Sequence, residues 1–390
     1  MRLTWVLCLA VAGVAVPARA GELPPARIGL VVPMAGEAGR VGQSMRRAAE
    51  MAIADWSDRL GRKVDLAVGD DQFDPRLAVT TAEKLVQDGV WGVVGHFYSS
   101  SSIPASAVYN QADIPMVTPT STHPRLTGQG FDNVFRVCGR DDQQAVTAAE
   151  FLLGRLRARR IAVVHDRTDY GRALADALLR ILERRAGRRI VRVEMIAQGE
   201  KDFSPLVARL RAVEPDAVYF GGIFREAGYL VRQLRQAGLG AAFVSDDAVL
   251  DPEFVKLAGE EAAKGAYLTF AQDPLRLPSA REVIRRFEAQ HGPMGPYVLH
   301  TYDAVGVLLH GFRLAKPRAN STEELRKVIR AIHAASFEGT LGTLRWDRSG
   351  DLVASPYVIY ETRKGGSLQG WFEPLPRAPA GEGSAPPVRR

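Results

Sequence analysis

Two successive runs of alternating strand-like and helix-like segments constrain the fold of this chain more than any other feature. The first run begins near residue 27 and the second near residue 141. The strand-like segments are short and apolar, which is typical of parallel strands buried on both faces. The segments between them carry apolar residues at helical spacing. We therefore predict an α/β fold with two Rossmann-like lobes, in which helices cover mostly parallel sheets.

The expected elements can be placed along both runs. In the first run, strands are expected at 28–32, 64–68, 90–94 and 114–117, with helices at 43–56, 75–87 and 103–112. In the second run, helices are expected at 145–156, 172–185, 204–213 and 226–237, with strands at 161–164, 190–196, 217–220 and 243–245. Asp74 before Pro75 indicates a helix start, because the aspartate can cap the helix and proline fits its first position.

The length of 390 residues suits two hydrophobic cores better than one. After Leu268 the chain is expected to be mostly helical, at 280–290, 297–314 and 322–334, before a strand-rich end that returns to both lobes. The expected N-terminal lobe comprises 21–140 and 272–350, and the expected C-terminal lobe comprises 141–271 and 351–372. Residues 373–390 are rich in proline, glycine, serine and alanine, which predicts a disordered tail.

The N-terminus has the pattern of a secretory signal peptide at residues 1–20. Arg2 precedes an apolar run at 3–16, Pro17 breaks that run, and 18–20 form a small-x-small cleavage site. The alternative, a retained membrane helix, would need about 18–20 apolar residues. We therefore expect export to the periplasm. Without the leader, Cys138 is the only cysteine in the sequence, so no internal disulfide can form.

The net charge of +7 does not indicate a nucleic-acid partner. Arg2 and Arg19 fall in the leader, and the other basic residues are interspersed with acidic ones. Nucleic-acid binding would need a basic face with aromatic or groove-reading residues nearby. The charges are therefore expected to form a solvated surface. The spacing of histidine, cysteine and acidic residues also predicts no metal site.

Two loops that follow expected strands are rich in hydroxyl side chains. One spans 95–102 and the other spans 119–124. In sheets of this kind ligands bind beyond the carboxyl ends of the strands, where backbone N–H groups and helix N-termini point outward. The two loops therefore suit a carboxylate, although plain N-capping would use the same hydroxyls.

These loops belong to a longer set of motifs through which the chain resembles the leucine/isoleucine/valine-binding proteins of bacterial ABC importers. The resemblance extends from about residue 27 to residue 360. Its motifs are Asp70-Asp71-Gln72-Phe73-Asp74-Pro75, Gly95-His96, Ser99-Ser100-Ser101, Pro104-Ala105-Ser106, Pro119 with Thr122 and Pro124, Leu126-Thr127, His165-Asp166, Tyr170-Gly171, the segment 199–204, Tyr219 before Gly221-Gly222, Gly295-Pro296-Tyr297, and Trp346-Asp347 before Gly350-Asp351.

The resemblance implies both a fold and a function. The fold is that of a type I periplasmic binding protein, with two lobes joined by three hinge crossings. The function is that of an extracytoplasmic solute-binding protein, which captures a branched-chain or similar amino acid by clamshell closure. It would deliver that ligand to the permease subunits of an ABC importer. Such a protein is expected to be a monomer, to use no cofactor and to catalyse no reaction.

Several ligand-binding residues are implied by the same resemblance. Ser99 and Thr122 align with loops that hold the α-carboxylate of the ligand, and Thr120 and Ser121 share the second loop. Tyr170 aligns with a tyrosine that the other lobe contributes on closure. The alternative for Tyr170 is a core or surface aromatic side chain at a helix start.

Asp247 stands where the leucine binders have a glutamate for the ligand's ammonium group. The aspartate keeps the negative charge that an ammonium needs, on a side chain shorter by one methylene. Alternatively, Asp247 is a solvated loop carboxylate beside Asp246, because the alignment at 245–247 could slip by one residue.

The implied side-chain pocket differs from that of the leucine binders. Ile223 stands at the position of a pocket tyrosine, and Phe97 and Tyr98 provide an aromatic wall. A cysteine pair found in some members aligns with Phe73 and Tyr98, and Tyr302 is also assigned to the pocket. The ligand's side chain therefore stays open, and an organic or aromatic acid is the alternative ligand.

Three other functions fit parts of the sequence. A nicotinamide-dependent dehydrogenase would use Gly36, Gly39 and Gly42, but the dinucleotide fingerprint needs a closer first spacing. A serine hydrolase would pair His96 with Ser99, but Ser99 lacks the flanking glycines of a nucleophile elbow. A sensory ligand module would share the fold, but such modules are usually fused to a membrane segment or signalling domain, and neither is expected here.

Overall fold

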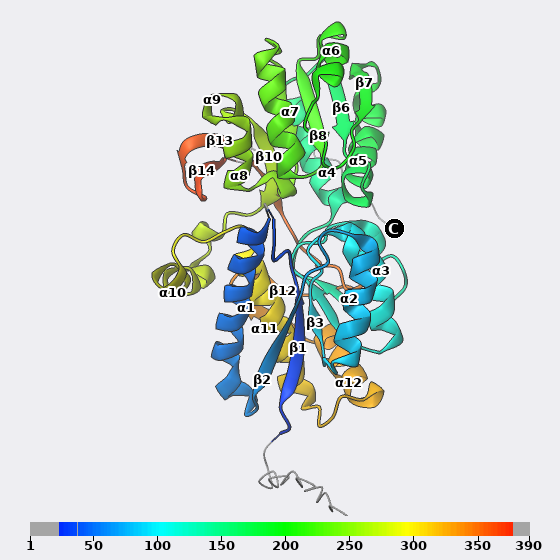
Figure 1. The fold of residues 1–390 in the computed structure, drawn as a ribbon, viewed down its shortest axis with the longest axis vertical. Helices are drawn as coiled ribbons and strands as arrows, with labels where there is room; N and C mark the ends of the chain where they lie inside the picture. Colours follow the sequence, from blue (N-terminus) through cyan, green and yellow to red (C-terminus); the bar gives the residue numbers. More distant parts are fainter. Residues whose placement is uncertain (1–22, 37, 377–390) are drawn as a thin grey trace, which may run out of the picture.

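The computed structural model describes residues 23–36 and 38–376, which form two α/β lobes, each around its own sheet (Figure 1). The lobes lie end to end along the long axis of the molecule. The predicted two-lobe α/β fold class is confirmed. The predicted signal peptide at 1–20 lies outside the described residues, and so does the part of the predicted tail from 377 onward.

The N-terminal lobe has a five-stranded parallel sheet in the order β2-β1-β3-β4-β5. Its strands are β1 (Ala26–Val31), β2 (Val64–Gly69), β3 (Val93–Val94), β4 (Met116–Thr118) and β5 (Val134–Arg136). The helices of this lobe are α1 (Gly39–Leu60), α2 (Pro75–Gln87), α3 (Ser99–Gln111), α10 (Arg281–His291), α11 (Val298–Ala315) and α12 (Thr322–Ala334). Helix α1 packs on α11 and α2 packs on α3, and a small hairpin of β11 (Phe337–Gly339) and β12 (Gly342–Leu344) follows α12.

The C-terminal lobe has a seven-stranded sheet in the order β14-β13-β10-β9-β8-β6-β7. The parallel part consists of β6 (Ile161–His165), β7 (Ile190–Met195), β8 (Ala217–Gly221), β9 (Ala242–Ser245) and β10 (Tyr267–Ala271). The antiparallel strands β13 (Tyr357–Gly366) and β14 (Gly370–Pro374) extend it beyond β10. The helices are α4 (Asp141–Glu150), α5 (Asp169–Ala186), α6 (Ser204–Ala212), α7 (Phe224–Gln236), α8 (Pro252–Ala258) and α9 (Glu260–Ala263).

Short helical segments of other types complete the fold. They are the π-helix η2 (Phe151–Arg155), which continues α4, and the 3-10 helices η1 (Pro124–Leu126), η3 (Gly187–Arg189), η4 (Asp247–Val249), η5 (Pro274–Arg276) and η6 (Pro278–Ala280). Within the described part of the chain, no helix combines the length and the apolar character that crossing a membrane requires.

Three strands depart from the expectations of the sequence. Strand β5 has three residues, which is too short for a periodic signal. Strand β10 continues past Leu268, where the chain was expected to become helical. Strand β14 runs to Pro374, so the expectation of a disordered tail from residue 373 is wrong at its start. Phe372 on β14 is fully buried, and burial of this ring holds the last strand on the sheet.

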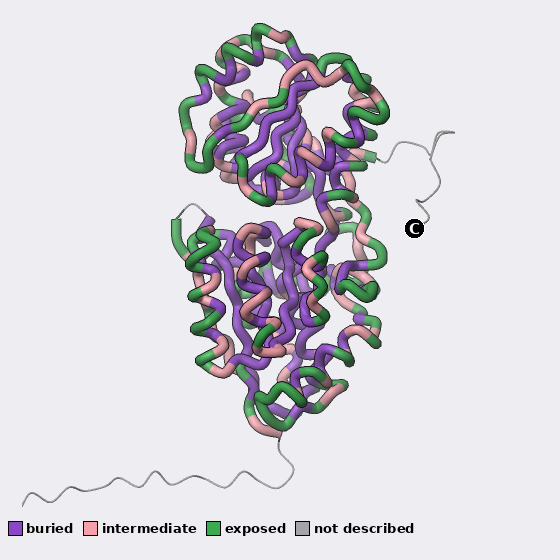
Figure 2. The backbone as a smooth tube through the Cα atoms, turned by 90° about the vertical axis from the view of Figure 1, so that its right-hand side faces the viewer, coloured by how far each residue is buried: buried purple, intermediate pink, exposed green. Residues whose placement is uncertain are grey.

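The chain passes between the two sheets three times. The connecting segments are 137–140 between β5 and α4, 272–280 between β10 and α10, and 345–356 between β12 and β13. Figure 2 shows buried backbone running through the centre of each lobe. Lobes joined by such segments can rotate as rigid bodies about them.

Local sequence signals set where the helices beside the cleft begin. The Asp74 Oδ1 accepts hydrogen bonds from the backbone N–H groups of Arg76 at 2.6 Å and Leu77 at 3.4 Å, and Pro75 occupies the first helical position. The predicted start of α2 is therefore confirmed. Helix α3 begins at Ser99, four residues before the predicted start at 103, so its first turn contains the serine run.

Gly42 allows α1 to pack closely against the segment that follows β1. A Cβ atom at this position would lie 1.6 Å from the carbonyl oxygen of Pro33. We expect Gly42→Ala to lower the free energy of unfolding by about 3 kcal/mol, because backbone must move to relieve the overlap. Urea unfolding followed by circular dichroism measures the change.

Gly154→Ala is the matched control, because an added Cβ there meets no atom within 4 Å. Alanine also favours helical backbone over glycine. The control should be neutral or stabilising. Equal stability of Gly42→Ala and wild type would contradict this account of the packing.

Candidate functional site

Residues from both lobes surround a small cavity at the carboxyl ends of the two sheets, which we call the inner chamber. The N-terminal lobe contributes loop residues after β3 and β4 and the residue before α11, and the C-terminal lobe contributes residues after β6 and β9. The cavity has a volume of about 20 Å³. Its lining residues are Phe97, Tyr98, Ser99, Thr120, Tyr170, Asp247, Ala248 and Tyr297.

A buried hydrogen-bond network holds the N-terminal side of the inner chamber in place. The His96 ring contacts the Asp71 carboxylate at 2.7 Å through Nδ1 and the Tyr109 hydroxyl at 2.9 Å through Nε2. The His96 carbonyl accepts hydrogen bonds from the hydroxyls of Ser102 and Ser121, both at 3.1 Å. These bonds join the loop after β3 to the loop after β4, so the two loops present their hydroxyls as one rigid unit.

The same network removes the geometric basis of the serine hydrolase alternative. Both ring nitrogens of His96 already contact Asp71 and Tyr109. The Ser99 hydroxyl instead accepts a hydrogen bond from the backbone N–H of His123 at 3.3 Å. A general base needs a free ring nitrogen within reach of the nucleophile, and His96 does not supply one to Ser99.

Ser99 lies at the first position of α3, a helix of 13 residues. The first N–H groups of such a helix lack partners within the helix, and the helix dipole favours negative charge there. Thr120 borders the inner chamber from the neighbouring loop, and its hydroxyl donates to the carbonyl of Phe97 at 2.5 Å. This side of the chamber is therefore suited to an anion.

The opposite side of the inner chamber carries a carboxylate. The Asp247 Oδ1 accepts hydrogen bonds from the Tyr170 hydroxyl at 2.7 Å and from the Gln144 side-chain amide at 2.8 Å. The Tyr297 hydroxyl, which comes from the other lobe, donates to the Asp247 carbonyl at 2.9 Å. Burial raises the pKa of Asp247 above its usual range. A cation at this side of the chamber would therefore find an acceptor that is already oriented.

The structure brings most of the predicted ligand-binding residues together. Phe97, Tyr98, Ser99, Thr120, Tyr170 and Asp247 all line the inner chamber. Ile223 lines an adjoining space of about 480 Å³ that also borders Tyr98 and Tyr170, and we call it the outer chamber. Ser121 and Thr122 share the loop of Thr120 and are fully buried, but neither borders the cavity. The Ser121 hydroxyl faces Ser102, at 2.6 Å, and therefore braces the loop.

The assignment of Tyr302 to the pocket is wrong. This residue lies on α11, and its hydroxyl donates to the Asp55 carboxylate of α1 at 2.5 Å. Asp55 also binds Arg286 of α10, so Tyr302 joins three helices of the N-terminal lobe. In this segment of the chain, the aromatic side chain that lines the chamber is Tyr297, five positions before Tyr302. The Gly295-Pro296-Tyr297 motif was the signal for it, because the motif precedes a helix that begins at the cleft.

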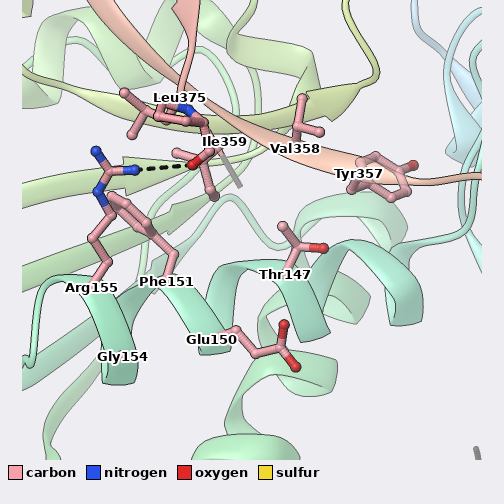
Figure 3. A pocket seen from close by; sticks show the side chains of 10 residues that line it. Thr147, Glu150, Phe151, Gly154, Arg155, Tyr357, Val358, Ile359 and Leu375 are labelled. Carbon is pink, nitrogen blue, oxygen red and sulfur yellow. Dashed lines mark hydrogen bonds between the residues drawn. The ribbon is translucent and has the colours of Figure 1, made fainter. Parts of the chain in front are cut away.

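A separate groove lies within the C-terminal lobe, between the α4–η2 segment and β13 (Figure 3). Its volume is about 550 Å³, and Thr147, Glu150, Phe151 and Arg155 face Val358, Ile359 and Leu375 across it. Arg155 donates to the carbonyl of Pro376 at 3.4 Å. None of the predicted ligand-binding residues lies in this groove, so the inner chamber is the better candidate site.

No group of three or more histidine, cysteine, aspartate or glutamate side chains among residues 23–36 and 38–376 could hold a metal ion. Cys138 is buried, and burial raises the pKa of its thiol to about 12. Such a thiol does not form the reactive thiolate at neutral pH.

Comparisons with known proteins agree with the two-lobe fold. A family model described as periplasmic binding protein matches residues 25–367. An amino acid binding protein of Pseudomonas aeruginosa is 39% identical over 339 residues, which cover 86% of this chain and 89% of that protein. A Leu/Ile/Val-binding protein homolog of Brucella melitensis is 36% identical over 341 residues, which cover 87% of this chain and 90% of that protein. The crystal structure of a leucine binding protein from Thermotoga maritima has a TM-score of 0.81 and 25% identity, covering 90% of this chain and 98% of that one.

Asp141, at the start of α4, makes stability depend on pH. Burial and the neighbouring Asp247 charge raise the pKa of Asp141 to about 8, although the Thr122 hydroxyl opposes the shift. In the unfolded chain, the carboxyl group of Asp141 titrates near the ordinary aspartate pKa of about 3.9. Asp141 therefore contributes most to stability below about pH 4, and this contribution is lost as the pH rises through about 8.

We expect Asp141→Asn to stabilise the ligand-free protein by about 2 kcal/mol more at pH 8 than at pH 5, because asparagine stays neutral. Urea unfolding at both pH values measures this difference. Asp142→Asn is the control, since Asp142 lies on the same turn with a half-exposed side chain. Equal pH dependence in wild type and Asp141→Asn would contradict the assignment.

Proposed function

We propose, from the premise that the chain belongs to the periplasmic binding protein family, that it is an extracytoplasmic solute-binding protein of an ABC importer. In this role it captures a small amino acid by closure of its two lobes and delivers it to membrane permease subunits. It binds its ligand without catalysing a reaction. The observation that carries the proposal is the inner chamber, where an anion-binding side and a carboxylate from different lobes face each other.

The carboxylate of the ligand would bind at the N-terminal lobe. The start of α3 offers backbone N–H groups together with the hydroxyl of Ser99, and Thr120 of the neighbouring loop borders the same chamber. Charge-assisted hydrogen bonds of this type are stronger than neutral ones. A single carboxylate can accept from both loops because the His96 network holds them at a constant separation.

The ammonium group of the ligand would bind at the C-terminal lobe, against Asp247. Tyr170 and Gln144 fix the orientation of this carboxylate. An ammonium in a dry cleft needs such a counter-charge, since an unpaired buried ion costs several kcal/mol. The carboxylate of Asp247 borders the same chamber as Ser99 and Thr120, which supports an α-amino acid over a simple carboxylate.

Ligand entry would require the lobes to separate. The inner chamber has a volume of about 20 Å³, which holds about one water molecule. Two contacts cross between the lobes beside it: the bond from Tyr297 to Asp247, and an ion pair of 2.8 Å between Arg40 of α1 and Asp251 before α8. Rotation about the three crossing segments would break both contacts and expose the chamber.

The ligand family is supported by relatives as well as by geometry. The relative from Pseudomonas aeruginosa is an amino acid binding protein, and those from Brucella are homologs of a Leu/Ile/Val-binding protein. We therefore place the ligand among amino acids, with delivery to permease subunits as the downstream step. Export to the periplasm follows from the same role.

Ser99→Ala tests the carboxylate side of the site, because Ser99 lines the inner chamber and Thr122 does not. The change should weaken amino-acid binding by about 10- to 150-fold, because a hydrogen bond to a charged group contributes about 1.5–3 kcal/mol. Titration calorimetry with a panel of amino acids measures the affinities. Ser106→Ala is the control, since this buried serine of α3 donates to the Ile103 carbonyl, away from the chamber. Wild-type affinity in Ser99→Ala would refute the carboxylate site.

Asp247→Asn tests the ammonium side. The substitution keeps the shape and removes the charge, so affinity for amino acids should fall at least about tenfold, on a cost of about 2–5 kcal/mol for an unpaired charge. Carboxylic acids without the amine should lose much less. Asp246→Asn is the comparison, because the Asp246 oxygens accept from the backbone N–H groups of Gly222 and Ala248. If only carboxylates without an amine bind the wild type, the ligand is an organic or aromatic acid instead.

A further inference from the structure

Two short runs rich in arginine meet at the end of the C-terminal lobe that lies farthest from the cleft. One run, 157–160, precedes β6, and the other, 184–189, ends α5 and forms η3 before β7. Strands β6 and β7 are parallel neighbours, and Ile161 pairs with Ile190. The amino ends of these strands therefore lie side by side, and α5 ends next to them (Figure 1). We call this surface the basic pole, which comprises Arg157, Arg159, Arg160, Arg184, Arg185, Arg188 and Arg189.

Hydrogen bonds to backbone carbonyls hold part of the basic pole in place. The Arg189 Nη1 donates to the carbonyl of Ala158 at 3.1 Å, which links the two runs directly. The Arg160 guanidinium donates to the carbonyl of Val213 at 2.6 Å and to that of Glu214 at 2.9 Å. Because a carbonyl carries no net charge, these bonds orient the guanidinium groups without neutralising them.

Acidic side chains compensate the charge of the basic pole only in part. Four acidic residues are bonded to these arginines or adjacent to them in sequence, namely Glu150, Glu183, Glu214 and Asp216. Within the described chain, Arg185 alone of the seven forms an ion pair, with Glu150 at 3.7 Å. The Asp216 carboxylate accepts instead from the backbone N–H groups of Arg159 and Arg160. The members that are exposed and make no ion pair with a described residue include Arg157, Arg159, Arg184 and Arg188.

Helix stability explains only some of these arginines. Basic residues are favourable at the C-terminal end of a helix, and Arg184 and Arg185 lie in the last turn of α5. Arg157 and Arg159 lie outside any helix, so no helix dipole accounts for them. Like charges gathered on one surface also repel each other, and a bound polyanion would relieve this repulsion.

We propose that the basic pole binds the phosphate headgroups of an anionic phospholipid membrane. The planar guanidinium group of arginine can donate two parallel hydrogen bonds to one phosphate. The inner chamber, the outer chamber and the groove of Figure 3 are all lined by other residues, so the pole is an outer surface rather than part of these cavities. Arginines on such a surface can contact several headgroups of one leaflet at once, and their attractions add.

Nucleic acid fits the basic pole less well than a membrane does. Neither arginine-rich run contains an aromatic side chain on which a base could stack. The proposed function already places the protein beside the membrane that holds its permease, and the pole adds a second contact there. The inner chamber borders the carboxyl ends of the strands, at the opposite end of this lobe. The pole can therefore bind a membrane while the cleft opens and closes.

Co-sedimentation of the purified protein with lipid vesicles tests the inference. One set of vesicles contains phosphatidylglycerol and phosphatidylcholine in equal amounts, and the other contains phosphatidylcholine alone. We expect binding to the first set only, and loss of this binding at high salt, because mobile ions screen the attraction. The pole variant combines Arg157→Gln, Arg159→Gln, Arg184→Gln and Arg188→Gln. Its affinity for the first set should fall by about fivefold for each charge removed.

A matched control variant removes the same number of charges from the N-terminal lobe. It replaces exposed arginines that form no ion pair within the described segments, and it combines Arg47→Gln, Arg281→Gln, Arg318→Gln and Arg330→Gln. This control should bind the phosphatidylglycerol vesicles like wild type. Should the pole variant not fold, as judged by circular dichroism, the double variant Arg157→Gln with Arg188→Gln decides in its place.

Three vesicle results would overturn the inference: no binding of wild type to phosphatidylglycerol vesicles, wild-type binding by the pole variant, or equal losses in the pole and control variants. Tighter binding of wild type to double-stranded DNA or to polyglutamate than to the vesicles would replace the membrane with that partner. Titration calorimetry with amino acids is a separate measurement, in which the pole variant should keep wild-type affinity. A wild type that binds vesicles but no amino acid would refute the proposed function and leave this inference standing.

Discussion

The buried ion pair between Arg136 and Asp351 joins the third crossing segment, 345–356, to the loop after β4 that borders the inner chamber. Arg136 ends β5, is fully buried, and donates to the Asp351 Oδ1 at 2.7 Å. Its other N–H groups donate to the carbonyls of Ser121 and His123, in the loop after β4. Arg140, next to α4, donates to the second Asp351 oxygen at 2.6 Å. Removing one member of a buried pair costs about 3–5 kcal/mol, so the hinge and the loop are fixed together.

This arrangement assigns different mechanical roles to the two sides of the site. Arg136 and Asp351 keep the loop after β4 in place relative to the first and third crossing segments. Asp247 and Tyr170 belong to the other lobe and move when these segments bend. The bond from Tyr297 to the Asp247 carbonyl then forms only when the two sides approach. In the proposed function, ligand binding and lobe closure would therefore be coupled through contacts that neither lobe can make alone.

Much of the fold was predictable because apolar periodicity is a local signal, whereas the errors came from nonlocal packing. The loop of Ser99 was predicted from its place after a strand, because parallel strands bring such loops to one edge of a sheet, whereas Asp247 was assigned from the resemblance to the leucine binders. Tyr302 was misassigned because five residues along a helix turn a side chain by about 140° from Tyr297. Which of the two faces the cleft depends on how α11 packs against α1 and α10.

The contact between Phe73 and Tyr98 shows why this site differs from one closed by a disulfide at the same positions. The two rings meet edge to face with centroids 4.3 Å apart, and Phe97 packs on Tyr98 at 4.8 Å. An aromatic pair adds about 0.5–1.5 kcal/mol beyond area burial, whereas a disulfide typically contributes about 2–4 kcal/mol. Tyr98 is therefore held by packing that a rotamer change can break, and no covalent bond limits its movement. Because Tyr98 lines both the inner and the outer chamber, a rotamer change of this ring would alter the boundary between the two spaces.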